Sequence, residues 1–195
     1  MSWEKVDEQP LEPSVSGSPM AVTESQDVPG QIRMFRGTTR LAFGVDAIAL
    51  AVSAPEARMK WVERMAEDRL IDGSIESGEW TSYEAYDLIW PVSNRDYVFR
   101  QTLEKSEQDG KNRTVVSVAS IEHPDFPPTS DRVRGSLPTC VFTLDEVSET
   151  ETDLKVVVQV DPGGSLPEFV KNVIQKGWAL KTMRALNTYM GHHSG

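Results

Sequence analysis

Cysteine and histidine are scarce in this chain of 195 residues. Its one cysteine, Cys140, has no partner for an internal disulfide, and its neighbours Val141 and Phe142 predict a small core side chain rather than a nucleophile. Of the three histidines, His192 and His193 lie in a terminal Gly-His-His-Ser-Gly stretch, to which we assign no role. The sequence therefore predicts no metal site and no catalytic set, and it contains no Gly-rich phosphate loop.

Long apolar runs and an excess of positive charge are also missing. No run of about 18 apolar residues exists that would span a membrane, and residues 1–5 do not resemble a signal peptide. We therefore expect a soluble protein that is cytoplasmic or, if a leader has been removed, periplasmic. The 20 basic and 30 acidic residues give a net charge of −10, which argues against a nucleic-acid partner because phosphates require clustered cations.

Length and pattern indicate one domain. Prolines and serines in residues 1–19 predict an irregular, partly helical lead-in, followed by the domain over 20–190 and a disordered tail over 191–195. Within the domain we expect short strands over 20–43, helices over 45–52 and 56–65, and six strands over 70–75, 79–88, 97–105, 114–121, 139–147 and 154–160. Because βαβ alternation is absent, this order predicts an α+β fold in which a C-terminal helix grips an antiparallel sheet.

The segment 154–190 joins an apolar strand to a long helix. Apolar residues alternate along 154–160, so one face of the strand is wholly apolar. The turn over 161–168 contains two glycines, and Ser165 and Glu168 have the spacing of a capping box at a helix start. The helix that follows is apolar along one side, so it can seal either a core or a cavity.

Polar residues are predicted on the inner face of the sheet. In the strand over 97–105, one face carries Tyr97, Phe99, Gln101 and Leu103, and this is the face that we expect to be buried. Gln101 and Glu84 then lie inside, where polar groups need a partner. The two side chains are therefore expected to pair with each other, with water or with a ligand.

Three other polar residues have structural interpretations. Arg95 and Asp96 are expected to form an ion pair that braces the turn over 91–94. His123 is expected to close a strand by hydrogen bonding to a loop. Its neighbour Glu122 would point to the opposite face, so the two cannot form a simple dyad.

Several short motifs occur together in the order and spacing of START domains, the steroidogenic-acute-regulatory-related lipid-transfer modules. They are Pro-Val-Ser-Asn-Arg-Asp-Tyr-Val over 91–98, Ser-Ile-Glu-His-Pro over 120–124, Val-Arg-Gly over 133–135 and Asp-Pro-Gly-Gly-Ser-Leu-Pro over 161–167. Segments 32–37 and 58–61 resemble the same pattern. The chain thus resembles a START domain of the helix-grip, Bet v 1-like superfamily from about Trp3 to Tyr189, and it looks most like the bacterial START-like proteins.

The resemblance implies a helix-grip fold, in which a curved antiparallel sheet surrounds a hydrophobic tunnel closed by the long C-terminal helix. Such a domain binds one lipid, needs no cofactor, acts as a monomer and touches a membrane transiently. The loop with Ile89, Trp90, Pro91 and Val92 would lie beside the lid. Trp90 at its tip either enters the membrane interface, where indole is favoured, or folds onto the protein, and both alternatives stay open.

The resemblance also implies candidate lipid contacts without identifying one lipid. Arg58 stands where the phosphatidylcholine-binding branch has an arginine that meets the phosphate, and Tyr97 matches one member of its choline cage. The other cage positions fall on Glu84 and about Pro138, and Gln101 replaces the inward arginine of sterol carriers. The predicted lipid-binding residues are Arg58, Glu84, Tyr86, Tyr97, Phe99, Gln101, Phe169, Val173 and Trp178.

Lipid binding and transfer is the function that we expect, with two alternatives. Related helix-grip folds include aromatase/cyclases and hydrolase-like members, and a cavity with Glu84, Tyr97 and Arg58 would support acid–base chemistry. Against an enzyme, no histidine or evident nucleophile lies on the presumed inner faces. The other alternative is an interaction module that signals lipid occupancy through its lid to a separate partner.

Overall fold

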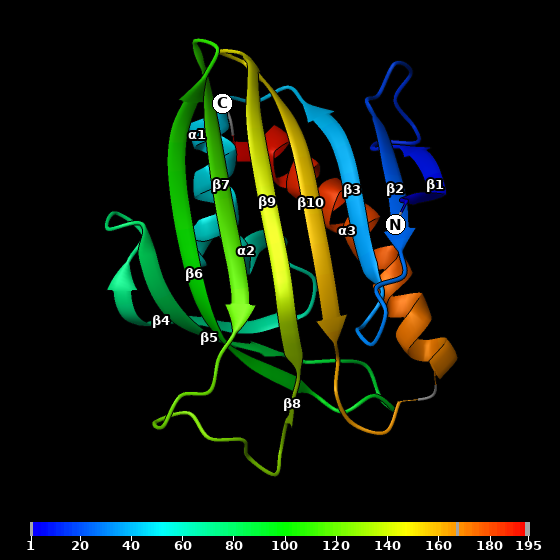
Figure 1. Cartoon of the computed structure of the whole chain (residues 1–195), viewed down its shortest axis with the longest axis vertical. Coiled ribbons are helices and arrows are strands. Elements are labelled where there is room, and N and C mark those ends of the chain that lie inside the picture. Colours follow the sequence, from blue (N-terminus) through cyan, green and yellow to red (C-terminus); the bar gives the residue numbers. More distant parts are fainter. Residues whose placement is uncertain (1, 167, 194–195) are drawn as a thin grey trace.

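One ten-stranded sheet forms the body of the computed structural model, which describes residues 2–166 and 168–193 (Figure 1). Its strands follow the order β1-β2-β3-β10-β9-β7-β6-β5-β4 with antiparallel neighbours, and the short β8 pairs parallel with β6. The strands are β1 (Glu4–Pro10), β2 (Met20–Gln26), β3 (Met34–Leu41), β4 (Met65–Ser74), β5 (Glu79–Tyr86), β6 (Arg95–Gln108), β7 (Lys111–Ser120), β8 (Val133–Arg134), β9 (Ser136–Ser148) and β10 (Glu151–Asp161).

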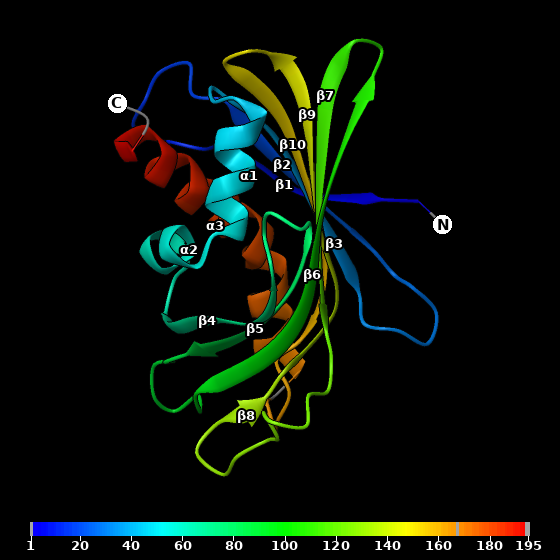
Figure 2. The same cartoon turned by 90° about the vertical axis from the view of Figure 1, so that its left-hand side faces the viewer.

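The helices of the described chain cover one face of the curved sheet (Figure 2). Helix α1 (Val45–Ser53) packs on β7 and β9, and α2 (Pro55–Trp61) packs on β4. Helix α3 (Glu168–His193) lies across β2, β3 and β10. None of the helices in the described residues has both the length and the hydropathy needed to cross a bilayer. The architecture is thus the predicted α+β helix grip.

The second helix ends earlier than predicted. A helix over 56–65 was expected, but α2 ends at Trp61. Arg64 then adopts a positive φ of 64°, and this left-handed conformation cannot continue a right-handed helix. The chain enters β4 directly at Met65. As a result Asp68 belongs to the sheet instead of to a connecting segment.

The N-terminal segment is a strand, which corrects the predicted partly helical lead-in. Residues 4–10 form β1 and pair antiparallel with β2, and Leu11 is buried in the core. The guanidinium of Arg36 lies 4.3 Å from the centre of the Trp3 ring. β1 supplies ladder partners to an edge of β2 that would otherwise lack them, so the irregular part is confined to residues 11–19.

The ends of α3 also differ from the prediction. The helix continues through residues 191–193, which were expected to be a disordered tail, and residues 194–195 lie outside the described part. The predicted capping box cannot be placed, because Pro167 and the side chain of Glu168 lie outside the described residues. Before the helix, Gly163 and Gly164 adopt φ of 66° and 69°. Glycine reaches this left-handed region without steric cost, which permits the tight turn.

Cys140 and His123 have the structural roles that the sequence predicts. Cys140 is buried in β9, and burial raises the pKa of its thiol to about 12, so no thiolate forms near neutral pH. The Nδ1 atom of His123 accepts a hydrogen bond from the backbone N–H of Asp125 at 3.3 Å. The histidine therefore orders the loop that follows β7.

Candidate ligand-binding site

The concave face of the sheet, which the helices cover, is lined by alternate residues of each strand. Gly37 of β3 identifies this face, because a Cβ atom there would lie 2.7 Å from the Met183 side chain of α3. Strand register then gives one buried row across the sheet, formed by Trp80, Gln101, Val118, Cys140, Val158 and Phe35. We call the packed region between this face and the three helices the interior.

A charged cluster lies in the interior where α2 meets β4 and β5. Arg58 Nε donates to Asp68 Oδ2 at 2.8 Å, and its Nη2 donates to Glu84 Oε1 at 2.7 Å. Its Nη1 donates to the carbonyl of Val52 at 3.3 Å. The hydroxyl of Tyr86 donates to Glu84 Oε2 at 2.6 Å. Two carboxylates therefore share one guanidinium, and both oxygens of Glu84 are engaged.

Burial controls the protonation of this cluster. Burial raises the pKa of Glu84 and outweighs the lowering effect of Arg58. Burial likewise raises the pKa of Tyr86 well above its ordinary value of 10.0, so its hydroxyl stays a donor. Although burial by itself lowers the pKa of Arg58, the carboxylates of Glu84 and Asp68 raise it. The charges +1, −1 and −1 sum to −1 when Glu84 is ionised and to zero when it is protonated.

Aromatic rings continue the wall beside the cluster. Tyr97 stacks on Phe99 with ring centres 5.2 Å apart, and Tyr86 meets Tyr97 edge-on at 5.7 Å. Burial raises the pKa of Tyr97 to about 12. A Cβ atom on Gly135 would lie 2.3 Å from Cε1 of Tyr97. The glycine of the Val-Arg-Gly motif therefore makes room for this ring.

Gln101 and Glu84 are both buried, as predicted, but they do not pair with each other. Gln101 Nε2 donates to Ser82 Oγ at 2.7 Å. Within the described residues, four buried polar atoms of the interior and its edge have no hydrogen-bond partner: Gln101 Oε1, Trp80 Nε1, Asp68 Oδ1 and Ser53 Oγ. Native proteins rarely leave such atoms unpaired.

Arg95 and Asp96 do not form the predicted ion pair, because successive residues of a strand point to opposite faces. Arg95 donates to the carbonyls of 162–163 at 2.9 and 3.3 Å and to the carbonyl of Ser93. Asp96 instead receives two hydrogen bonds of 2.9 Å from Arg134. Arg95 thus joins the loop that precedes β6 to the turn that precedes α3.

Of the three lipid-binding residues predicted on the C-terminal helix α3, the structure describes the side chain of one. Trp178 is half-buried and packs against the core, whereas the side chains of Phe169 and Val173 lie outside the described residues. Gln175, which the sequence did not single out, is buried and donates from Nε2 to the carbonyl of Val160 at 2.8 Å. This bond fastens α3 to the end of β10.

The loop between β5 and β6 exposes its apolar residues. The exposed fractions are 88% for Trp90 and 65% for Ile89, while Pro91 is exposed and Val92 is half-buried. Trp90 is therefore not folded onto the protein. Of the two alternatives, this conformation is the one in which the indole ring is accessible to a membrane surface.

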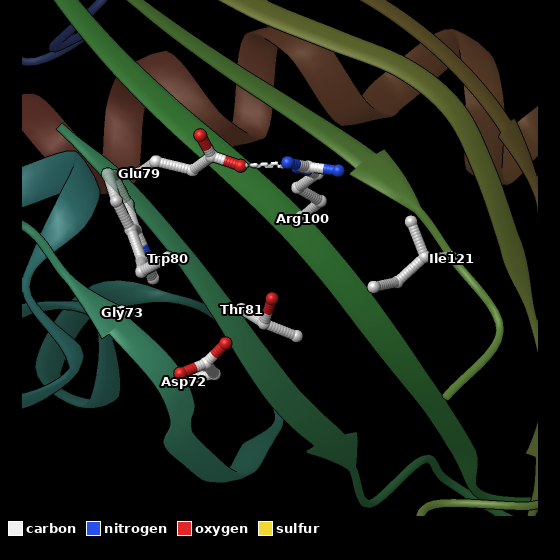
Figure 3. Close-up of a pocket in the computed structure, with 7 residues that line it drawn as sticks. All are labelled: Asp72, Gly73, Glu79, Trp80, Thr81, Arg100 and Ile121. Carbon is white, nitrogen blue, oxygen red and sulfur yellow. Dashed lines mark hydrogen bonds and ion pairs between the residues drawn. The ribbon is translucent and has the colours of Figure 1, made fainter. Parts of the chain in front are cut away.

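A separate pocket of about 390 Å³ lies on the opposite, outer face of the sheet. It is lined by Asp72, Gly73, Glu79, Trp80, Thr81, Arg100 and Ile121 (Figure 3). Arg100 Nε donates to Glu79 Oε1 at 2.6 Å. Glu79 and Arg100 are each one residue from the inward-facing Trp80 and Gln101, so this pocket does not open on the interior face.

Comparison with known families agrees with this architecture. The family model of the START domain matches residues 21–193. The chain belongs to the START family.

Among the described residues no group of three or more His, Cys, Asp or Glu side chains is placed to hold a metal ion.

START relatives match most of the chain. Uncharacterized protein PA1579 of Pseudomonas aeruginosa is 26% identical over 156 residues, which cover 80% of this chain and 74% of the relative. Phosphatidylcholine transfer protein of Rattus norvegicus is 27% identical over 124 residues, which cover 64% of this chain and 54% of the relative. The solved STAR-related lipid transfer protein of Xanthomonas axonopodis has a TM-score of 0.76 and 26% identity, covering 97% of this chain and 98% of that one.

Some interior residues of this START domain were not predicted from the sequence. Trp80 and Ser82 alternate with Glu84 along β5, so period-two spacing was a signal that would have found them. Asp68 offered no such signal. It lay outside the predicted strand over 70–75, and only the early end of α2 places it beside Arg58.

Proposed function

We propose that this START domain binds a single lipid in its interior and carries it between membranes. The observation that carries the proposal is the composition of the interior, where apolar walls enclose a few buried polar atoms without partners. Binding sites for hydrophobic ligands have this character, since apolar area supplies affinity and a few polar groups fix orientation.

The apolar walls favour a ligand with hydrocarbon chains. Rings from β6 and side chains from β7, β9 and β10 line one side, and α3 covers the other with residues such as Met183 and Leu186. Removing apolar surface from water is worth about 25 cal/mol per Å². A lipid tail gains this energy in the interior without any specific polar contact.

Release requires the cover of the interior to move, and Arg95 joins the two segments best placed to do so. Its guanidinium bonds Ser93 in the loop that carries Trp90, and it bonds residues 162–163 in the turn before α3. We propose that the loop and the start of α3 open together at a membrane. Such lid motions occur on microsecond to millisecond timescales.

The relatives support this class of function. Rat phosphatidylcholine transfer protein and the Xanthomonas STAR-related lipid transfer protein are both named for the transfer of lipids. They support a lipid cargo for the present chain.

We propose a carrier rather than an enzyme. Each oxygen of Glu84 already accepts a hydrogen bond, from Arg58 and from Tyr86, and this fixed pairing favours a structural role for the carboxyl over proton transfer with a substrate. A Glu84→Ala variant that still bound ligand but lost a measurable turnover would favour an enzyme instead.

Native mass spectrometry of the purified protein tests the proposal. We expect one bound lipid per chain, and we expect the protein to shield a fluorescent lipid from a water-soluble quencher. A second measurement follows the transfer of that lipid between donor and acceptor vesicles. Protein that carries no lipid, shields none and does not accelerate exchange would contradict the proposal.

A further inference from the structure

Among the residues whose side chains the structure describes, each buried cation of the inner face already has hydrogen-bond partners within the protein. Within the described part of the chain, these cations are Arg58 and Arg95. Arg58 is bound by the carboxylates of Asp68 and Glu84 at 2.8 and 2.7 Å. Arg95 is bound by three backbone carbonyls. A phosphate would therefore have to displace a carboxylate from Arg58 or lie beside it.

Both carboxylates are placed to keep phosphate away. The side chains of Asp68 and Glu84 are buried to 1% and 0% exposure, where little water screens repulsion between like charges. Glu84 is further held by the hydroxyl of Tyr86 at 2.6 Å, so it cannot swing aside without losing two hydrogen bonds. Asp68 has one oxygen on Arg58, and its other oxygen has no partner among the described residues.

The unpaired atoms match an uncharged, hydroxyl-bearing ligand. Gln101 and Trp80 are register partners on adjacent strands, and they present an unpaired acceptor, Oε1, and an unpaired donor, Nε1. Ser82 holds the amide nitrogen of Gln101 at 2.7 Å, which leaves the oxygen for a ligand. A hydroxyl group both donates and accepts, so it satisfies groups of either kind. A phosphate ester, which only accepts, cannot satisfy Gln101 Oε1 or Asp68 Oδ1.

We propose that Asp68 and Glu84 act together as a selectivity element that excludes phosphate-bearing lipids, and that the interior takes an uncharged lipid with a free hydroxyl. This inference rests on the proposed lipid-binding function and gives that function a ligand class. Asp68 is the specificity-determining residue. Its removal frees one edge of the Arg58 guanidinium and makes the net charge of the cluster one unit more positive in either protonation state of Glu84.

Two fluorescent probes with identical acyl chains test the proposal. One is nitrobenzoxadiazole-labelled diacylglycerol, which has a free hydroxyl, and the other is the corresponding phosphatidylcholine. We expect the native protein to bind diacylglycerol at least about tenfold more tightly. Asp68→Asn should reduce or reverse this preference by strengthening binding of phosphatidylcholine. Asp153→Asn is the matched control, because it removes the same charge from an exposed pair with Arg40, and it should leave the preference unchanged.

Glu84→Gln provides an independent variant if Asp68→Asn does not fold, as judged by its thermal transition. It removes the second carboxylate and should shift the preference in the same direction. Equal or tighter binding of phosphatidylcholine by the native protein overturns the selectivity proposal. An unchanged preference in both variants also overturns it. If the native protein binds neither probe and copurifies with no lipid, the proposed function itself fails.

Discussion

At the scale of single residues, the charged side chains around Arg58 are hydrogen-bonded to one another. Arg58 engages two carboxylates and one carbonyl, and Tyr86 completes Glu84. This arrangement makes the guanidinium a structural support for α2 against β4 and β5. It also leaves a small set of unpaired atoms, notably on Gln101 and Trp80, at which a ligand can bind.

Replacing Arg58 tests its structural role. Arg58→Met should lower the free energy of unfolding by about 3–5 kcal/mol, because two buried carboxylates lose their cation. Urea denaturation of the ligand-free protein measures the change. Arg40→Met removes a guanidinium from the exposed pair with Asp153 and should leave the unfolding midpoint nearly unchanged. Similar losses in both variants would contradict the argument.

The raised pKa of Glu84 predicts how stability depends on pH. Between the ordinary carboxyl value of 4.5 and its higher value in the folded protein, Glu84 binds more protons when the chain is folded. Stability from this group is therefore complete below 4.5 and falls as the pH rises through the folded value. Glu84→Gln should remove this dependence. Urea titrations from pH 4 to pH 8 give the free energy of unfolding of the native protein and of the variant. We expect the difference between the two free energies to change with pH, and a constant difference would refute the argument.

Sequence alone identified which residues face inward but not what they bind. Period-two spacing placed Tyr97, Phe99 and Gln101 on one buried face, and the structure has them there. The partner of Gln101 is Ser82 rather than Glu84, because strand register decides which side chains are adjacent. A single sequence contains no direct signal for register, or for the early end of α2 that brings Asp68 beside Arg58.

At the scale of elements, α3 is held on the sheet by close backbone approach and by a few specific bonds. A Cβ atom on Gly37 of β3 would lie 2.7 Å from Met183 and 3.1 Å from Ala179, so the strand backbone and the helix approach each other closely. Gln175 adds a hydrogen bond to the end of β10. The helix therefore packs tightly in its middle, where the sheet has no side chain to separate the two.

A methyl group at Gly37 should loosen this packing. Gly37→Ala places Cβ 2.7 Å from Met183 Cε, and overpacking of this kind costs about 1–3 kcal/mol. The matched control is Gly177→Ala within α3, where the nearest atom would be 3.9 Å away. Because glycine weakens helices by roughly 0.5–1 kcal/mol relative to alanine, the control should stabilise the protein. Thermal unfolding of both variants should give shifts of opposite sign.

Element prediction succeeded where the pattern was local and failed where pairing was remote. The alternation over 154–160 predicted the strand β10, which runs somewhat further, from Glu151 to Asp161. Strand β1 was missed because its charged sequence lacks an apolar face, and it forms by pairing with the edge of β2. That edge exists only after the sheet has assembled.

At the scale of the whole molecule, the exposed loop and the charge of the chain act in opposite directions at a membrane. The loop presents Trp90 and Ile89 to solvent beside the start of β6. The net charge of −10 opposes close approach to an anionic surface, and this repulsion weakens as salt screens it. We therefore expect brief contact that depends on the loop rather than on general electrostatic attraction.

Replacing the loop tryptophan tests this mode of contact. Trp90→Ala should lower partitioning onto neutral phosphatidylcholine vesicles by about tenfold, because inserting a large apolar side chain is worth about 1.5–3 kcal/mol. Its unfolding midpoint should barely change, since the ring is 88% exposed. Leu50→Ala on α1 removes another exposed apolar side chain, 60% accessible, and should not alter partitioning. Co-sedimentation with vesicles measures both variants. Equal losses of binding would mean that adsorption is general rather than directed by the loop, and that Trp90 has no special part in releasing the ligand.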